Sequence, residues 1–392
     1  MISTIPEYSS LKEHWPLDKN MVFLNHGSFG ACTHIVLKAQ QEFRQRLESE
    51  PLRFLIRELE PLYFESKAFL ADVIGVNSGD MVFVRNATEG VNTVLNSILW
   101  NKNDRILITD HIYPACKNAI KFYAAKHDLQ IDEVIIPYPF EEEIDIVTTI
   151  VKNVKPDTRL LLLDHISSPT AIVFPIKEIA DALKGSGTDI LIDGAHAPGA
   201  IPLNIKELGV QYYTGNCHKW LCAPKGSAFL WVHPDFQEWI YPLNISYINL
   251  KGNAFEEKFY WTGTQDPTPW LAIPAAVNAL KEISGKSLVQ IAETNHRLNI
   301  EATHIICDSL NIKIPCPEQS LACMTTFPLP EISPAPQPNE PDPIQEQLYH
   351  NYHIEIPVTH MENGQRFLRI SCHLYNHISQ YRFLAEVLED IL

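Results

Sequence analysis

The chain has 392 residues, of which 45% are hydrophobic and 20% charged, a composition typical of a folded globular protein rather than a disordered one. Its 31 basic and 47 acidic residues give a formal net charge of −16, and no stretch gathers lysine and arginine into a basic stripe. This balance argues against nucleic acid and anionic membrane surfaces as partners.

The start of the chain, MISTIPEYSSLKEHW, has neither the basic segment nor the apolar segment of a targeting peptide, and no apolar run is long enough to span a membrane. We therefore expect a soluble, cytoplasmic protein. The eight cysteines form no Cys-x-x-Cys pair. We expect them to be reduced and mostly buried thiols.

Residues 21–283 alternate short β-rich runs with amphipathic stretches, the pattern of an α/β fold with a mainly parallel sheet. Helices are expected where apolar residues recur three and four positions apart, at 61–74, 88–100 and 274–283. Strands are expected at 105–109, 133–136, 159–163, 189–192, 212–214 and 228–232. Several of these strands end in a polar or small residue, and ligands gather at the carboxyl ends of strands in such sheets.

From residue 287 the pattern changes to a helix up to about residue 310, short strands, and a closing helix over 379–392. We interpret residues 21–283 as a large α/β domain, and residues 1–20 with 284–392 as a smaller α+β domain. Residues 327–343 carry seven prolines and are expected to form an extended surface loop without regular structure. The loop is either a plain connector or a flap over a site.

A lysine stands at the end of an expected strand, in the run YYTGNCHKW at 212–220. Its neighbours Cys217, His218 and Trp220 would partly desolvate Lys219, lower the pKa of its amine and leave it able to form a Schiff base with an aldehyde. Taken alone, such a lysine is an ordinary surface residue.

Two upstream features add to this lysine. Asp193 follows the apolar strand expected at 189–192, where a carboxylate can keep the pyridine nitrogen of pyridoxal phosphate (PLP) protonated. The run Asn-Ala-Thr-Glu at 86–89 precedes a helical stretch, so its amides and the Thr88 hydroxyl can meet a phosphate at a helix N-terminus. The same run is also compatible with a plain N-cap.

The phosphate loop, the acid and the lysine, in this order, resemble the class V family of fold type I PLP enzymes. The resemblance extends from FLNHGSFG at 23–30 to LRISCHLYN at 368–376. Within the class it is greatest for the isopenicillin N epimerase and hercynylcysteine sulfoxide lyase group, through DHISSPTA at 164–171, GNCHKW at 215–220 and WTGTQDPTP at 261–269. It implies the α/β fold type I of PLP-dependent transferases and pyridoxal 5'-phosphate as cofactor.

The resemblance also implies roles around the cofactor ring. Lys219 would form the internal aldimine and then act as base and acid at the substrate Cα. Asp193 would pair with the pyridinium, and His196 would hydrogen-bond the phenolic oxygen. Tyr113 falls where relatives place a ring-stacking group, with His111 as the alternative.

The cofactor phosphate would be held by Ala87, Thr88, the amide of Glu89, Asn216 and His218. Thr264 would reach the cofactor phosphate of a partner subunit, so the resemblance implies a two-fold homodimer whose active site is built from both chains. The alternative is that residues 261–269 are only a proline-rich turn.

Substrate-binding residues follow from the same resemblance. Arg369 would grip the α-carboxylate of a small amino-acid substrate, a task suited to a planar bidentate donor. Asn25, His26, Ser28 and Ser168 would border the substrate. Taken alone, the first three are turn formers, and Arg369 is an arginine in a surface strand.

Other kinds of site lack their signatures. No Gly-x-Gly-x-x-Gly follows a strand, and HGSFG at 26–30 lacks the first glycine of a serine hydrolase elbow. No histidines stand at metal-ligand spacing, so we expect no metal.

The leading hypothesis is β-elimination at a C–S bond of a cysteine-derived amino acid, which gives pyruvate, ammonia and a sulfur species. Tyr113 is the candidate proton donor to the leaving sulfur. Epimerisation and transamination are the alternatives, and a non-catalytic relative is the alternative from a different class. Persulfide chemistry is disfavoured, because Cys316, Cys323 and Cys372 do not stand in the setting expected of a nucleophilic cysteine.

Overall fold

The computed structural model describes residues 6–140, 145–246, 254–330 and 340–392. Its helices are α1 His26–Phe29, α2 His34–Ser49, α3 Pro51–Arg53, α4 Leu59–Ile74, α5 Ala87–Ser97, α6 Pro114–His127, α7 Ile146–Val151, α8 Ile176–Ala182, α9 Phe255–Tyr260, α10 Thr268–Leu271, α11 Ile273–Ser284, α12 Leu288–Leu310, α13 Pro343–Tyr352 and α14 Ile378–Ile391. Within these described ranges, no helix is both long and apolar enough to cross a membrane.

The strands form three sheets. Their bounds are β1 Val22–Phe23, β2 Met81–Val84, β3 Arg105–Thr109, β4 Gln130–Val134, β5 Thr158–Asp164, β6 Asp189–Asp193, β7 Tyr212–Asn216, β8 Ala228–Val232, β9 Met324–Leu329, β10 Ile354–Glu355, β11 Val358–His360 and β12 Arg366–Ser371. The central sheet has seven strands in the order β2-β8-β7-β6-β5-β3-β4. Only β8 runs against the others, so the mainly parallel α/β sheet of fold type I is confirmed.

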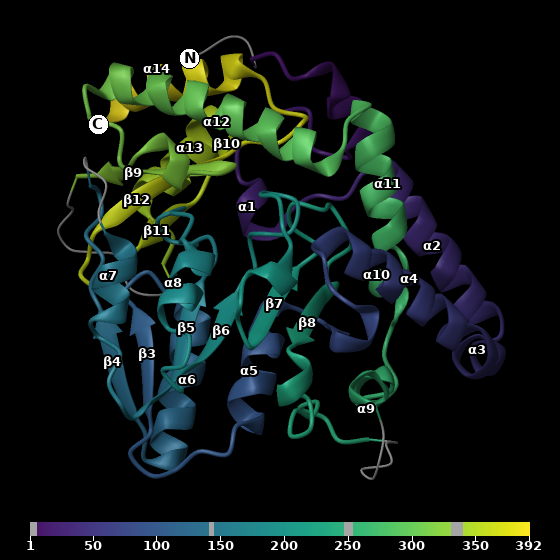
Figure 1. Ribbon diagram of the computed structural model, residues 1–392. Coiled ribbons are helices and arrows are strands. Elements are labelled where there is room, and N and C mark those ends of the chain that lie inside the picture. Colours follow the sequence, from purple (N-terminus) through teal and green to yellow (C-terminus); the bar gives the residue numbers. More distant parts are fainter. Residues whose placement is uncertain (1–5, 141–144, 247–253, 331–339) are drawn as a thin grey trace.

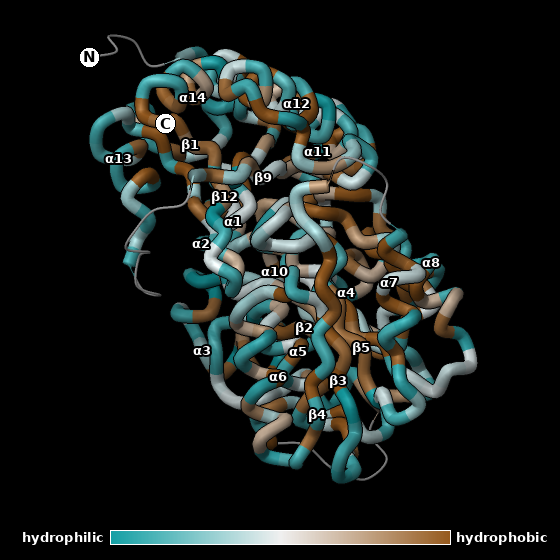
Figure 2. Tube along the Cα trace, turned by 90° about the vertical axis from the view of Figure 1, so that its left-hand side faces the viewer, coloured by the Kyte–Doolittle hydropathy of each residue, from teal (hydrophilic) through white to brown (hydrophobic). Residues whose placement is uncertain are grey.

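Different helices cover the two faces of the central sheet, because successive residues of a strand point to opposite sides. In β3, Ile106 and Ile108 pack in the apolar cluster that includes α5 and α6. Leu107 points the other way, into the cluster that includes α4, α8 and α11. In Figure 2 the hydrophobic stretches run through the middle of the molecule, and most hydrophilic segments lie on the outer helices and loops. Burial on both faces explains why the central strands read as continuous apolar runs.

The C-terminal part of the chain forms a second layer above the carboxyl ends of the central strands (Figure 1). Its three-stranded antiparallel sheet has the order β11-β12-β9, and apolar residues of α12 and α14 pack against it. The short strand β1 pairs in parallel with β10, so residues 22–23 lie with this layer. The division into domains 21–283 and 1–20 with 284–392 stays a proposal, and β1 falls just past its first boundary.

Some details differ from the expectation. The strand expected at 133–136 is β4, at Gln130–Val134, an edge strand that pairs only with β3. The apolar run 134–136 shifted the expectation, and Ile135 is in fact exposed. Strand β2 and helices α2 and α6 were not among the expected elements.

The proline-rich segment 327–343 is not wholly irregular. Its first residues belong to β9, where Pro328 lies opposite Phe367. A proline fits there because β9 is an edge strand. Near its end, Asp342 is buried and forms a bidentate ion pair with Arg366, with N···O distances of 2.6 and 2.7 Å. Residues 331–339 lie outside the described residues. The expectation that this segment is either a connector or a flap therefore also falls outside them.

Candidate active site

A cavity of about 350 Å³ lies at the carboxyl ends of β5, β6 and β7. The start of α5 and the helix α1 of the N-terminal segment close its sides. Most of the residues expected at the site line this one cavity: Ser28, Ala87, Thr88, Tyr113, Ser168, Asp193, His196, Asn216, His218 and Lys219. The fold thus gathers residues that are up to 191 positions apart (219 − 28).

Lys219 is buried in this cavity, and its Nζ lies 2.9 Å from Nε2 of His196. Burial, helped by the positive charge of Arg369, lowers the pKa of Lys219 to about 7. Burial and Lys219 hold the pKa of His196 well below its usual range, so this imidazole is neutral. A large share of the Lys219 amine is therefore free to attack a carbonyl carbon at neutral pH.

Asp193 is the last residue of β6 and is buried on the cavity floor. Its Oδ2 accepts from Cys116 Sγ at 3.1 Å, and its Oδ1 accepts from the amide of Ala195 at 3.0 Å. Burial raises the pKa of this carboxyl group, while these hydrogen bonds and Lys219 oppose the rise. A ring nitrogen carrying a proton would supply the opposite charge that the buried carboxylate needs.

Helix α5 begins at one end of the cavity and is capped by side chains. Asn86 is its N-cap residue, and its Oδ1 accepts the amide of Glu89 at 2.8 Å. The amide of Ala87 donates to Oδ1 of Asn216 at 2.9 Å. Thr88 and His218 also line the cavity here. Their polar groups, at the start of a helix, would suit the binding of an anion.

The amide and the carboxylate of Glu89 are both engaged within the chain. Its amide is taken by Asn86, and its carboxylate accepts the amide of Arg85 at 2.6 Å and the Arg85 guanidinium at 3.0 Å. Glu89 is not among the cavity-lining residues. The side chain thus turns back onto the residue before the N-cap Asn86, and the expected contact of the Glu89 amide with a cofactor phosphate stays a prediction.

Arg369 lies buried in β12 and reaches across to the central sheet. Its Nη1 donates to the backbone oxygen of Ser168 at 2.7 Å, and its Nη2 donates to Oγ of Ser28 at 2.9 Å. Ser28 in turn donates to Oδ1 of Asn25 at 2.5 Å. The Nε of Arg369 has no hydrogen-bond partner, and no acidic side chain of the described ranges pairs with the Arg369 guanidinium. This guanidinium is therefore ready for a carboxylate brought by a ligand.

Tyr113 precedes α6 and lines the cavity with 41% of its surface exposed. Burial and the nearby Cys116 and Asp193 raise the pKa of its hydroxyl group, so it carries a proton at neutral pH. His111 is fully buried elsewhere, with its Nδ1 2.7 Å from Oγ1 of Thr170. Of the two candidates for the ring-facing group, only Tyr113 reaches the cavity.

His26 does not border the cavity as expected. Its ring lies behind Lys219, with Nε2 3.0 Å from the backbone oxygen of Lys219 and Nδ1 2.9 Å from the Tyr375 hydroxyl. Because a carbonyl oxygen only accepts, Nε2 carries the proton and Nδ1 accepts from Tyr375. His26 therefore holds the backbone of the lysine and does not contact the cavity.

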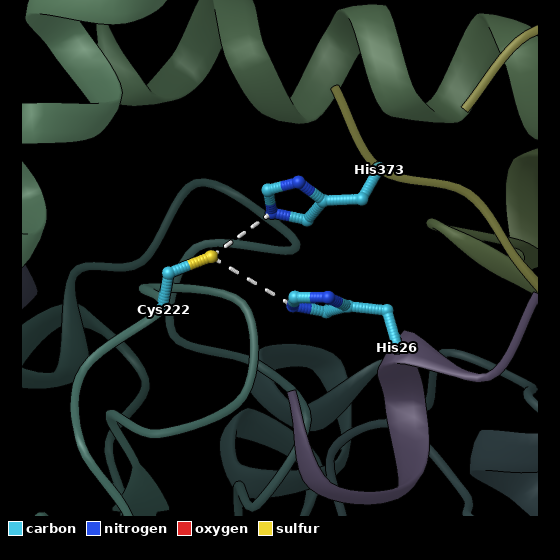
Figure 3. A group of neighbouring side chains, drawn as sticks. All are labelled: His26, Cys222 and His373. Atoms are coloured by element: carbon cyan, nitrogen blue, oxygen red, sulfur yellow. Dashed lines mark hydrogen bonds between the residues drawn. The ribbon is translucent and has the colours of Figure 1, made fainter. Parts of the chain in front are cut away.

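His26, Cys222 and His373 form a buried group (Figure 3). The Cys222 Sγ lies 3.6 Å from Nε2 of His373 and 3.9 Å from Nε2 of His26. The two imidazoles are stacked at 4.2 Å with 26° between their planes, so their Nε2 lone pairs do not converge on one point. Since Nε2 of His26 also donates to Lys219, we interpret the group as support for the lysine segment and not as a metal site.

Thr264 is exposed and does not line the cavity of its own chain. Its expected contact with a partner's cofactor therefore stays a prediction.

Among the cavity-lining residues that the sequence reasoning missed are Asp164, Phe29 and Lys225. Asp164 could have been found, because it ends the strand β5 as Asp193 ends β6. Phe29 is 72% exposed at the cavity, and no pattern in the sequence marks it. Lys225 donates to the backbone oxygen of Gly30 at 2.9 Å, a contact that only the fold brings about.

Known proteins resemble this chain over nearly its whole length. It is 27% identical over 398 residues to the probable L-cysteine desulfhydrase, chloroplastic, of Arabidopsis thaliana, covering 96% of this chain and 84% of that one. It is 27% identical over 403 residues to isopenicillin N epimerase of Streptomyces clavuligerus, covering 99% of each.

Among solved structures, the complex of the cystine C–S lyase C-DES with its reaction product cysteine persulfide has the same fold, with a TM-score of 0.79 and 21% identity over 95% of this chain and 98% of that one. The family model of aminotransferase class-V matches residues 31–381, and the chain belongs to this family.

Proposed function

We propose that this chain is a PLP-dependent lyase that cleaves the C–S bond of a cysteine-derived α-amino acid by β-elimination. The observation that carries the proposal is the convergence of Lys219 and Asp193 on one cavity, next to Arg369, which donates hydrogen bonds to the cavity-lining residues Ser28 and Ser168. All eight cysteines are buried and none lines the cavity. Relatives named L-cysteine desulfhydrase support the same reaction class.

The cavity fits PLP by its donor set. Lys219 offers an amine with a lowered pKa, Asp193 a buried carboxylate without a cation of its own, and the start of α5 an anion site at Thr88. Nδ1 of the buried His196 has no hydrogen-bond partner in the described residues, which leaves it for the cofactor. When bound, PLP withdraws electrons from the bonds at the substrate Cα through its protonated ring.

The residues of the chain then divide the work. Arg369 binds the substrate α-carboxylate, with Ser28 and Ser168 fixing the plane of its guanidinium. The Lys219 amine takes the Cα proton, since its lowered pKa of about 7 leaves a large share of it unprotonated at neutral pH. Tyr113, whose raised pKa keeps its proton, donates that proton to the leaving sulfur.

The balance of the reaction is an elimination. The Cα–H and Cβ–S bonds break, a Cα=Cβ double bond forms, and the sulfur leaves with a proton. The released enamine reacts with water to give pyruvate and ammonia. No oxidant or reductant is needed.

An amino-acid epimerase is the second candidate, favoured by the isopenicillin N epimerase relative that covers 99% of each chain. Epimerisation needs a second acid on the opposite face of Cα, and Tyr113, which lines the cavity, is a candidate for it. An aminotransferase is the third candidate.

The deciding experiment incubates the PLP-loaded protein with L-cysteine, L-cystine and S-substituted cysteine sulfoxides and measures pyruvate. Pyruvate released in proportion to the lost substrate supports the lyase. Loss of optical rotation with deuterium uptake at Cα and without pyruvate would support the epimerase, and accumulation of pyridoxamine phosphate would support the aminotransferase.

We also propose a homodimer with a shared active site. The support is Thr264, which is exposed and away from its own cavity, at the position where the sequence resemblance implies contact with a partner's cofactor. Mixing inactive Lys219→Ala chains with inactive Thr264 variants should restore part of the activity, because mixed dimers contain one intact site. Scattering that gives the mass of one chain would contradict the dimer. The cytoplasmic location stays a prediction.

A further inference from the structure

A second carboxyl group lies beside Asp193 and has no role in the reaction described above. Asp164 ends β5, and its Cα is paired in register with that of Asp193 on the neighbouring parallel strand. Residues paired in this way point to the same side of the sheet, on strands about 4.8 Å apart. Asp164 and Asp193 are 4% and 3% exposed, and both line the cavity.

Two buried carboxylates at this spacing cannot both be ionised without opposing charge. The titratable groups that act on Asp164 are Asp193 on β6, Lys219 after β7, and Tyr113 and Cys116 before and on α6. Of these, only Lys219 can be cationic. Once its amine is bound to the cofactor, it no longer serves as a free ammonium partner for either acid.

The surroundings of the two acids are unequal. Asp193 accepts hydrogen bonds from Cys116 and from the amide of Ala195, which stabilise its negative charge. Oδ1 of Asp164 is buried and has no hydrogen-bond partner in the described part of the chain. Burial and the charge of Asp193 together hold the pKa of Asp164 well above its usual range. The ionised form therefore belongs on Asp193 and the proton on Asp164.

Asp164 is also connected to both ends of the substrate site. The backbone of Tyr113 and of Ser168 lies near its carboxyl group and partly opposes the rise of its pKa. The backbone oxygen of Ser168 accepts a hydrogen bond from Arg369, and Tyr113 lines the cavity. A carboxyl group in this place fixes the two segments that meet the substrate.

We propose that Asp164 is a positioning residue that keeps its proton at neutral pH, so that Asp193 is the single negative charge of the pair and alone sets the charge on the cofactor ring nitrogen. The part of this inference that concerns the cofactor ring nitrogen rests on the proposed PLP-dependent function. The protonation of Asp164 itself can be measured without it.

The first experiment records infrared spectra of the protein at neutral pH, with and without PLP. We expect the carbonyl stretching band of a protonated carboxylic acid in the wild type and in Asp193→Asn, and its loss in Asp164→Asn. Absence of the band from the wild type at neutral pH would overturn the proposal, even if a variant fails to fold. A band that disappears only in Asp193→Asn would also overturn it, because the proton would then sit on the other acid.

The second experiment titrates PLP into each apoprotein and follows its absorption. Asparagine is the neutral isostere of a protonated aspartic acid, so Asp164→Asn should keep the PLP dissociation constant within about threefold of the wild type. Asp193→Asn should weaken binding about 100-fold, the loss expected when one partner of a buried charge pair is removed. The reverse order of the two variants would assign the ring nitrogen to Asp164 and overturn the inference.

The two experiments separate this inference from the proposed function. A protein that shows the Asp164 band and binds PLP but releases no pyruvate refutes the lyase and leaves the inference standing. A protein that releases pyruvate but lacks the band refutes the inference alone.

Discussion

The imidazole of His26 and the backbone oxygen of Lys219 are 3.0 Å apart, so the N-terminal helix α1 is bonded to the residue that carries the reactive amine. The same helix contains Ser28, whose Oγ accepts a hydrogen bond from Nη2 of Arg369. One turn of helix thus connects the amine proposed to take the substrate's Cα proton to the guanidinium proposed to bind its carboxylate.

The first prediction concerns this connection. His26→Ala should lower kcat/KM about 10- to 100-fold, because small displacements of a catalytic group have effects of this size. It should also lower the free energy of unfolding by about 1–3 kcal/mol, since the Tyr375 hydroxyl and the Lys219 carbonyl lose a buried partner. Tyr375→Phe is the matched control, because it removes one hydrogen bond and keeps the imidazole. Equal kinetic losses in both variants would contradict a specific role for the contact with Lys219.

The second prediction follows from the pKa of Lys219. With a pKa of about 7, the rate at which apoprotein binds added PLP should rise about fivefold from pH 6 to 7 and less than twofold from pH 7 to 8, following the unprotonated amine. The sign follows from burial, which favours the neutral amine. Stopped-flow absorption measures the rate, and Lys219→Ala should show no lysine-bound absorption at any pH. A rate that still climbs steeply above pH 9 would mean that the amine keeps its ordinary pKa.

The third prediction separates substrate binding from cofactor binding. Arg369→Met should raise KM for the amino acid by about 100-fold, since a charge-assisted bidentate contact is lost in a buried place. The dissociation constant of PLP should stay unchanged. Arg369→Lys keeps the charge without the planar fork, and we expect it to recover only part of the loss. A PLP affinity that falls while KM rises would show that the arginine serves the fold of the cavity.

The fourth prediction tests the proton donor. Tyr113→Phe should lower kcat for pyruvate release by about 100-fold or more, because general acid catalysis is lost at the sulfur. Exchange of the Cα proton with deuterium should continue, since that step depends on Lys219. Mass spectrometry of recovered substrate and a pyruvate assay measure the two steps in one reaction. If the rate of Cα exchange and the rate of pyruvate release fall by the same factor, Tyr113 acts before the sulfur leaves, which would contradict its role as the proton donor.

Much of this protein follows from its sequence. The central strands are buried on both faces, so their apolar runs mark them directly, and β8 at Ala228–Val232 is found to the residue. The edge strand β4 was misplaced because it is mostly exposed and its pairing with β3 is a tertiary choice. Lys219 and Asp193 were found because each stands at the end of such a buried strand or directly after it.

The tertiary structure decided the rest, because it depends on contacts between residues far apart in the chain. Glu89 stands in a good phosphate motif, but local hydrogen bonds turn it back onto Arg85. His26 stands in a loop that resembles a substrate loop, yet its ring lies behind Lys219. Asp193 and Lys219 could be predicted from the sequence because they lie at or after the ends of apolar strands. The pairing of Asp164 with Asp193 exists only in the folded chain, where two parallel strands lie side by side.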